Sequence, residues 1–254
     1  MEFRIEGQTI HVNVPTWAVL EARVRERFAQ RKGFALATIN LDHLVKLRGD
    51  TAFRIAYAAQ DFVVADGNPI VWMSKLAGRP VSLIPGSEAI EPLARIAAAQ
   101  GVKVALFGAS DPVLAAAKDY LEREIRDLDV VCTIAPAMGF DPKGELAEAM
   151  LGEIADSGAR LCFVALGAPK QEVFAAHGRK VAPEVGFVSI GAGLDFFAGT
   201  QNRAPKWVRT FALEWLWRAL SNPKRLGPRY AKCIAILPSE TAKAAMIRLG
   251  DSRE

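Results

Sequence analysis

Short, continuous apolar runs alternate along the first 200 residues with longer segments in which apolar and polar positions repeat at helical spacing. Continuous apolar runs are typical of strands buried on both faces of a sheet, and the longer segments are typical of amphipathic helices. The runs predict strands at residues 34–38, 62–65, 102–107, 130–134, 161–166 and 187–190. The segments between them predict helices at about residues 16–30, 42–59, 70–77, 88–100, 111–125, 144–157 and 170–182.

A hairpin is predicted ahead of this pattern, with strands at residues 3–5 and 9–12 around a Glu6–Gly7 turn. Strands that alternate with helices predict an α/β fold, here a Rossmann-like parallel sheet with helices on both faces. No linker interrupts this stretch, so we expect residues 1–200 to form one α/β domain that includes the hairpin, and residues 201–254 to form a helical appendage.

Composition narrows the class of protein. The chain has 254 residues, of which 51% are hydrophobic and 24% charged, which is ordinary for a globular domain with a sizeable core. Three cysteines without a CxxC spacing favour a reducing compartment over a disulfide framework. The start lacks a signal-peptide pattern, and no apolar stretch is long enough to span a bilayer, so we expect a soluble or peripheral cytoplasmic protein.

Charge is distributed unevenly. Residues 200–254 carry eleven Lys and Arg against four Asp and Glu, a net charge of +7, so residues 1–199 carry −3 of the total of +4. Three of the five tryptophans also lie in this segment: Trp207, Trp215 and Trp217. Cationic and aromatic segments of this kind contact polyanions or membrane surfaces.

Ligands of parallel α/β sheets bind outside the carboxyl ends of the strands, so the loops there are the candidates for chemistry. Thr38 and Asn40 end the first strand and can hydrogen-bond sugar hydroxyls, although Asn40 or Asp42 can instead simply cap the next helix. Asp66 and Gly67 end the second strand, where a carboxylate is placed to act as a general base. The alternative for Asp66 is an ordinary turn aspartate.

Three further loops have the composition of phosphate or nucleotide contacts. Small residues there permit close backbone approach, and helix N-termini supply amide donors. The candidates are Gly108 and Ser110 after the third strand, Gly167, Pro169, Lys170 and Gln171 after the fifth, and Gly191, Gly193 and Asp195 after the sixth. Glu172 fits a first-turn acid that complements the helix dipole, and the last set of glycines is equally typical of a helix packed closely on a sheet.

Several familiar motifs are absent from the sequence. The three histidines lack metal-ligand spacing, and the sequence contains no GxSxG, no GxxxxGK[ST] and no complete GxGxxG. Asp127-Leu128-Asp129 spells a DxD sequence, but it falls between a helix and a strand, where we expect solvated charge at the opposite end of the sheet.

Taken in order, these loops resemble the WecG/TagA/CpsF family, glycosyltransferase family 26, over roughly residues 15–235. The resemblance is carried by Thr38-x-Asn40, Ala65-Asp66-Gly67, Gly167-x-Pro169-Lys170-Gln171-Glu172, and Gly191-Ala192-Gly193-x-Asp195-Phe196 with Gly199. It continues in Arg203-Ala204-Pro205-x-Trp207, Glu214-Trp215-x-Trp217-Arg218, Pro223 and Arg229-Tyr230.

The resemblance implies a metal-independent, cofactor-free, inverting transfer of a sugar from a UDP-sugar to a polyprenyl diphosphate-linked saccharide. It implies a place on the inner face of a bacterial cell membrane, in the synthesis of a surface polysaccharide or exopolysaccharide. The oligomeric state stays open, since a membrane-associated monomer and a small homo-oligomer both fit. The resemblance further implies that Asp66 is the catalytic base, that Thr38 and Asn40 line the reaction centre, and that Gln171 contacts the donor or its leaving group.

One position departs from the family pattern. Many members carry an arginine two residues before the Pro-Gly of a segment like 83–88 and an aspartate where Glu88 stands, whereas this chain has Leu83 at the arginine position. Because a diphosphate leaving group needs positive charge, Arg79, Lys170 or Arg203 would have to supply it, or the donor is held differently.

The C-terminal segment suits a lipid-linked acceptor. An aromatic stripe at four-residue spacing is predicted from Trp207, and the expected contacts to the acceptor diphosphate or the membrane come from Arg203, Trp207, Arg218, Arg225 and Arg229. The alternative is that the stripe packs on the core and that Glu214 and Arg218 form an exposed pair.

Two other functions stay open at this level. The same strand ends suit a Rossmann-like oxidoreductase or methyltransferase with a nucleotide cofactor, although the glycine fingerprint is missing. A nucleic-acid binder using the basic segment is opposed by the acidic balance of residues 1–199 and by the lack of a known binding module, so no nucleic-acid partner is expected.

Overall fold

The computed structural model describes residues 1–199 and 223–251. The chain opens with an antiparallel hairpin of β1 (Glu2–Ile5) and β2 (Gln8–His11), as the alternation of its residues predicts. Helix α1 (Trp17–Ala29) follows, and Thr16 caps it by accepting a hydrogen bond from the backbone N–H of Val19. The predicted hairpin and first helix are confirmed.

A parallel sheet of six strands forms the centre of the domain. In chain order the strands are β3 (Phe34–Ile39), β4 (Phe62–Ala65), β5 (Val104–Gly108), β6 (Val130–Ile134), β7 (Leu161–Ala165) and β8 (Gly186–Ser189). In space their order is β4-β3-β8-β7-β5-β6. The last strand therefore lies beside the first, and the loops that follow β4, β3, β8 and β7 are neighbours along one edge.

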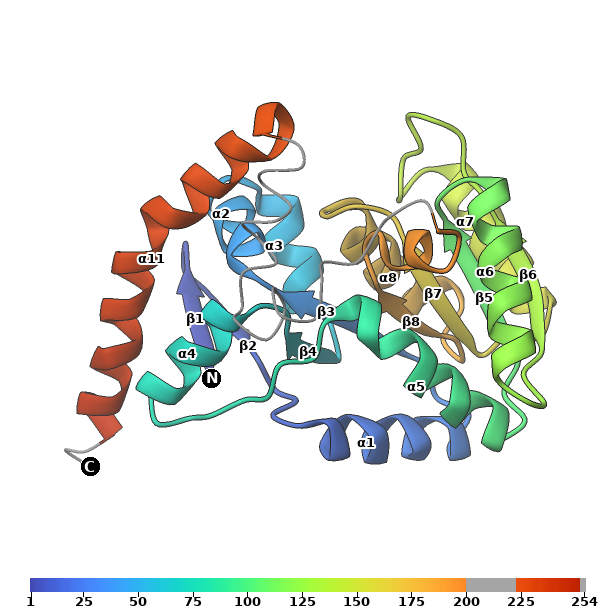
Figure 1. The fold of residues 1–254 in the computed structure, drawn as a ribbon, viewed down its shortest axis with the longest axis horizontal. Coiled ribbons are helices and arrows are strands. Elements are labelled where there is room, and N and C mark those ends of the chain that lie inside the picture. Colours follow the sequence, from blue (N-terminus) through green and yellow to red (C-terminus); the bar gives the residue numbers. More distant parts are fainter. Residues whose placement is uncertain (200–222, 252–254) are drawn as a thin grey trace.

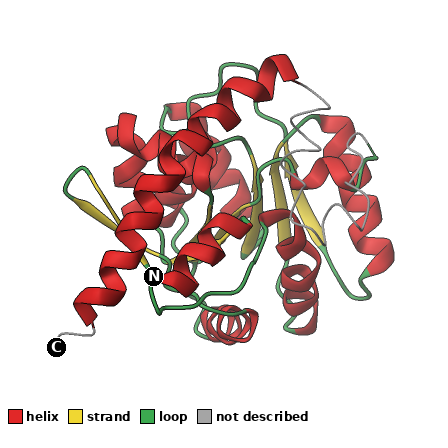
Figure 2. Ribbon diagram, turned by 60° about the vertical axis from the view of Figure 1, so that its left-hand side comes forward, coloured by secondary structure: helices red, strands yellow, loops and turns green. Residues whose placement is uncertain are grey.

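Helices cover both faces of this sheet, which makes the fold Rossmann-like (Figures 1 and 2). The helices after α1 are α2 (Leu41–Gly49), α3 (Thr51–Ala58), α4 (Asn68–Leu76), α5 (Gly86–Ala99), α6 (Asp111–Glu124), α7 (Glu145–Asp156), α8 (Lys170–Val181), the short η1 (Gly193–Phe196) and α11 (Pro223–Asp251). Alternate strand residues explain the two layers: Phe34, Leu36 and Val188 pack with α1, α5 and α6, whereas Ala35 and Phe187 pack with α7 and α8 on the other face.

The single helix predicted over residues 42–59 is wrong. The structure has two helices there, because Asp50 ends α2 in an extended conformation and caps α3 by accepting a hydrogen bond from the N–H of Phe53 at 2.9 Å. An aspartate that hydrogen-bonds the backbone three residues ahead starts a new helix rather than continuing the old one. The break turns α3 so that Tyr57 lies beneath the end of β3, where its hydroxyl donates to the carbonyl of Thr38.

Helix α11 runs beside α2 and α4, along the side of the domain that carries the hairpin (Figure 1). Two ion pairs join it to α2: Arg229 Nε lies 3.0 Å from Asp42 Oδ1, and buried Glu240 pairs with Arg48. Within α11, Glu240 also pairs with Lys243. The segment predicted as a separate appendage thus ends in a helix that packs on the α/β domain. Within residues 1–199 and 223–251, no helix combines the length and hydrophobicity needed to cross a bilayer.

Candidate active site

Asp66 stands at the carboxyl end of the sheet, immediately after β4. Its N–H donates to the carbonyl of Ile39 at 2.8 Å, which continues the pairing of β4 with β3 past the end of β4. Its Oδ2 lies 3.5 Å from Thr38 Oγ1 and 3.4 Å from Asn40 Nδ2. The half-buried carboxylate therefore faces one hydroxyl and one amide from the neighbouring strand end. The structure brings together three of the four residues that the sequence analysis assigned to the reaction centre, and the fourth, Gln171, makes its described contacts elsewhere.

Asn40 caps α2 and also contacts Asp66, while its contact with a sugar hydroxyl stays a prediction. Its Oδ1 accepts a hydrogen bond from the N–H of His43 at 3.1 Å, which caps α2, and this leaves Nδ2 to donate to Asp66. Capping thus fixes which end of the amide faces the carboxylate. The helix cap and the site residue are one side chain.

Two buried side chains, Tyr57 and His43, form hydrogen bonds at the end of β3. Tyr57 is 1% exposed and donates its single hydroxyl proton to the carbonyl of Thr38 at 2.8 Å. His43 Nδ1 lies 3.2 Å from the same hydroxyl, so it must be the N–H that donates to the Tyr57 oxygen. Burial lowers the pKa of His43 to about 4, which keeps the ring neutral. The sequence analysis missed both residues, because only the break at Asp50 places Tyr57 here.

Gly67 turns the chain from Asp66 into α4. Its φ of 127° lies in a region that side chains rarely adopt, and a Cβ there would lie 3.7 Å from Asn40 Cβ. Substitution would therefore strain the peptide next to the candidate base.

Several helices begin at this edge of the sheet without a side-chain cap. Helices α4, α5, α6 and α8 have no side-chain cap among the described residues, whereas α1, α2 and α3 are capped by side chains. Helix α4 starts directly after Asp66 and Gly67, and the start of α5 also lies beside this group, because a Cβ on Gly86 would lie 3.3 Å from Thr38 Cγ2 and from the Ser189 carbonyl. Free N–H groups and the helix dipole favour an anion in such a place.

The first two residues of α8 differ in exposure, because Lys170 is exposed and Gln171 is buried. Lys170 is exposed and donates to the carbonyl of Phe140 at 2.7 Å, and the loop contains Gly167 and a cis peptide between Ala168 and Pro169. Gln171 is 2% exposed: its Nε2 donates to Glu172 Oε1 at 2.8 Å, and its Oε1 accepts from the N–H of Gly191 at 2.9 Å. The described contacts of Gln171 are thus internal, and its contact with a donor stays a prediction.

Of the remaining candidate donor contacts, two glycines are packed closely against neighbouring residues, and Ser110 and Asp195 are at least partly exposed. A Cβ on Gly108 would lie 2.5 Å from the Ala165 carbonyl, and one on Gly193 would lie 2.7 Å from Ile90 of α5, so both glycines serve close packing. Ser110 is exposed at the start of α6, and Asp195 is half-buried in η1.

A carboxylate flanked by donor side chains, beside uncapped helix ends on a Rossmann-like sheet, is an arrangement that can activate an alcohol near a phosphate. The family model for the WecG/TagA/CpsF glycosyltransferases matches residues 6–248, almost the whole chain. The chain belongs to this family. It is a glycosyltransferase, which favours the transferase over the cofactor-dependent enzyme and the nucleic-acid binder considered above.

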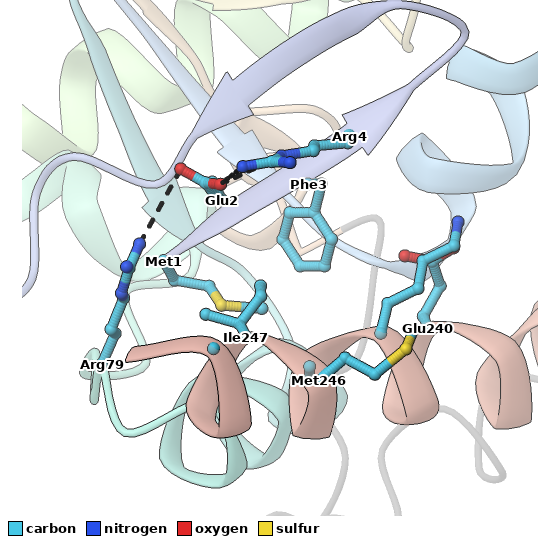
Figure 3. Close-up of a pocket in the computed structure, with 11 residues that line it drawn as sticks. Met1, Glu2, Phe3, Arg4, Arg79, Glu240, Met246 and Ile247 are labelled. Carbon is cyan, nitrogen blue, oxygen red and sulfur yellow. Dashed lines mark hydrogen bonds and ion pairs between the residues drawn. The ribbon is translucent and has the colours of Figure 1, made fainter. Parts of the chain in front are cut away.

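The position that departs from the glycosyltransferase pattern lies close to the candidate base. Leu83 is 39% exposed and forms an isolated parallel bridge with Ala65, directly before Asp66. Arg79 lies instead near the hairpin, 3.8 Å from Glu2, and lines a cavity of about 400 Å³ between the hairpin and α11 (Figure 3). Of the three candidate cations, Lys170 is therefore the one that the described residues place at the carboxyl edge.

The basic C-terminal residues are only partly described in this glycosyltransferase. Arg203, Trp207 and Arg218 lie outside the described residues, as does the side chain of Arg225. Arg229 is described, and it pairs with Asp42. Asp127 and Asp129 precede β6, at the amino end of the sheet as expected. Among the described residues, no three His, Cys, Asp or Glu side chains gather to hold a metal ion.

Proposed function

We propose that this glycosyltransferase moves a sugar from a UDP-sugar to a hydroxyl of a polyprenyl diphosphate-linked saccharide, with inversion, in bacterial surface or exopolysaccharide synthesis. The observation that carries the proposal is the Asp66 carboxylate at the carboxyl edge, within 3.5 Å of Thr38 Oγ1 and Asn40 Nδ2. Neighbouring donors orient the carboxylate, and partial burial limits its hydration, which is what a general base at a sugar hydroxyl requires.

The chemistry is a single displacement. Asp66 takes the proton from the acceptor hydroxyl while that oxygen forms a bond to the anomeric carbon of the donor. The bond from the anomeric carbon to the UDP oxygen breaks, and its electron pair leaves with UDP. Attack from the face opposite the leaving group inverts the anomeric centre.

The donor diphosphate is placed at the uncapped ends of α6 and α8. Backbone donors near Gly108, Ser110, Gly167 and Pro169 supply hydrogen bonds, and Lys170 supplies positive charge in place of the arginine that Leu83 replaces. Gly191, whose N–H donates to Gln171 in the first turn of α8, and Asp195 of η1 are the further donor contacts that we propose from the segment after β8. Dipoles and a cation fixed in advance stabilise the charge that develops on a leaving diphosphate without further rearrangement.

A panel of UDP-sugars tests the assignment. N-acetylated hexosamines and uronic acids are both offered, each with and without a synthetic prenyl diphosphate saccharide, and released UDP is measured. We expect one donor to release UDP at a rate that depends on the acceptor. Absence of release with every donor, with product formed from another nucleotide sugar instead, would contradict UDP-sugar dependence.

The basic C-terminal segment is proposed to hold the enzyme on the cytoplasmic membrane surface. Its described part, α11, exposes Ile234, Met246 and Leu249 together with Lys232. Basic residues near an anionic surface contribute about 1 kcal/mol each, so a peripheral attachment needs only a few of them.

Reversing two charges tests this attachment. Arg225→Glu with Lys232→Glu is expected to weaken sedimentation with anionic liposomes by at least about tenfold, because two favourable contributions of about 1 kcal/mol are lost. Arg229 is avoided, since a glutamate there would face Asp42 and loosen α11. The matched control is Lys32→Glu with Arg126→Glu, two basic positions that precede β3 and β6 at the amino end of the sheet. Equal liposome binding by both double variants would contradict the attachment.

A further inference from the structure

A fully buried acid lies behind the candidate donor site and touches a residue of that site. Glu172 is 0% exposed in the first turn of α8, and its Oε1 accepts a hydrogen bond from Gln171 Nε2 at 2.8 Å. Its Oε2 is buried and has no hydrogen-bond partner among the described residues. Burying a carboxyl group that lacks a full set of hydrogen bonds costs folding free energy. An exposed acid in the first turn would complement the helix dipole equally well, so the burial of Glu172 requires another explanation.

The contact with Glu172 decides which way the amide of Gln171 points. The Glu172 oxygen that faces Gln171 accepts a hydrogen bond in the carboxylate, and as the carbonyl oxygen in the protonated acid, so Nε2 of Gln171 faces it. That leaves Oε1 of Gln171 to accept the N–H of Gly191 at 2.9 Å, which a reversed amide could not do. The three residues therefore form one directed chain, from the first turn of α8 to the loop after β8.

This hydrogen-bond chain ends at Gly191, in the loop that borders the candidate site. Gly191 has a φ of 57° and leads into η1, where Gly193 packs on Ile90 and Ser87 at the start of α5. The same start of α5 contacts Thr38 through Gly86. A change in the Gly191 contact would therefore alter the wall next to the residues that face Asp66.

Hydrogen bonds from neighbouring elements hold the Glu172 end of this hydrogen-bond chain in place. Gln60, just after the end of α3, donates to the backbone carbonyl of Glu172 at 3.1 Å, and Lys46 of α2 donates to the carbonyl of Ala168 at 3.0 Å. Glu172 interacts electrostatically with three titratable side chains, which are Lys46 and Asp42 from α2 and Tyr57 from α3. The first turn of α8 is thus fixed to the two helices that support Thr38 and Asn40.

We propose that Glu172 is a positioning residue for donor binding, which acts by fixing the amide of Gln171 and, through it, the loop that begins at Gly191. This inference rests on the proposed function, because it assigns the loop to the UDP-sugar. It makes Glu172 neither a base nor a ligand. Its effect on catalysis runs entirely through the orientation of one neighbouring amide.

Two variants separate this role from a general packing role. Glu172→Gln keeps a carbonyl oxygen that can accept from Gln171, and Glu172→Met keeps the length of the side chain but removes every acceptor. Each is measured for exchange of the Gly191 amide proton by NMR on glycine-labelled enzyme, and for kcat and KM toward the UDP-sugar. If the Met variant does not fold, Glu172→Asp takes its place, because the shorter side chain withdraws the carboxylate from Gln171.

We expect the Met variant to exchange the Gly191 proton at least tenfold faster and to show a donor KM raised by about tenfold, with kcat changed much less. The Gln variant should restore both values to near those of the wild type. A folded Met variant with unchanged Gly191 exchange and unchanged donor KM would overturn the proposal. Because amide exchange is measured without any substrate, an enzyme that turns over no UDP-sugar would refute the proposed function while Gly191 exchange still decides whether Glu172 positions the loop.

Discussion

Replacing Asp66 with Asn is expected to lower kcat by about 10² to 10⁴ at saturating donor and acceptor, which is the usual contribution of a general base. The amide cannot accept the hydroxyl proton, but it keeps the shape of the carboxylate and its contacts with Thr38 and Asn40. KM for both substrates should therefore change little. The measurement is initial-rate UDP release over a range of both substrate concentrations.

The controls for this variant come from the DxD sequence. Asp127→Asn and Asp129→Asn alter two carboxylates that precede β6 at the far end of the sheet, so both should leave kcat unchanged within about twofold. If Asp66→Asn turned over as fast as the wild type, or if Asp127→Asn and Asp129→Asn lost activity while Asp66→Asn kept it, the assignment of the base would be wrong.

Replacing Glu172 with Gln is expected to remove a large dependence of stability on pH. Burial raises the pKa of Glu172 from an ordinary value of 4.5 to about 7. Below pH 4.5 the carboxyl is neutral in both the folded and the unfolded chain and imposes no penalty. Between pH 4.5 and 7 the unfolded chain loses this proton while the folded protein keeps it, and above pH 7 the folded protein holds a buried carboxylate, so stability falls by about 3 kcal/mol between pH 4.5 and 7.

The difference in unfolding free energy between the wild type and Glu172→Gln isolates the contribution of this one carboxyl group. Free energies of unfolding of the wild type and Glu172→Gln are measured by urea denaturation at pH 4.5 and at pH 8, and the variant should gain about 3 kcal/mol relative to the wild type between them. Glu145→Gln is the matched control, because Glu145 lies in the first turn of α7 but is exposed. A difference between wild type and Glu172→Gln that stays constant with pH would contradict the burial of an ionisable group at this position.

The meeting of Thr38, Asn40 and Asp66 could be predicted from the sequence. Each follows a short apolar run, and the carboxyl ends of parallel strands lie at one edge of a sheet. Once β3 and β4 pair, the register that sets Ile39 beside Ala65 brings Asp66 against its two neighbours. Local pattern and a general rule of topology were sufficient for this part of the site.

The support beneath those residues could not be predicted. The apolar spacing of residues 42–59 fits one helix, and only the capping bond of Asp50 ends α2 and turns α3 so that Tyr57 meets Thr38. The order of the strands is likewise a property of the whole fold. It places β8 beside β3 and lets the start of α5 contact Thr38, although Thr38 and Gly86 are far apart in the chain.

The roles of Gln171 and Glu172 were left open for a different reason. Two adjacent polar residues at the start of a helix suit an exposed ligand contact as well as a buried network, and burial depends on what covers them. In this fold α2 and α3 cover the first turn of α8, so the glutamate that resembled a dipole complement is buried and orients its neighbour.

The anomeric configuration of the product tests the central claim most directly. A single displacement assisted by Asp66 inverts the anomeric centre, so an α-linked UDP-sugar should give a β-linked product, which the coupling between the H1 and H2 protons in the NMR spectrum distinguishes for sugars of suitable ring geometry. We predict inversion. Retention of the donor's configuration would contradict the account, because it would require a covalent glycosyl-enzyme or attack from the leaving-group face, and Asp66 would then not be the base of a direct displacement.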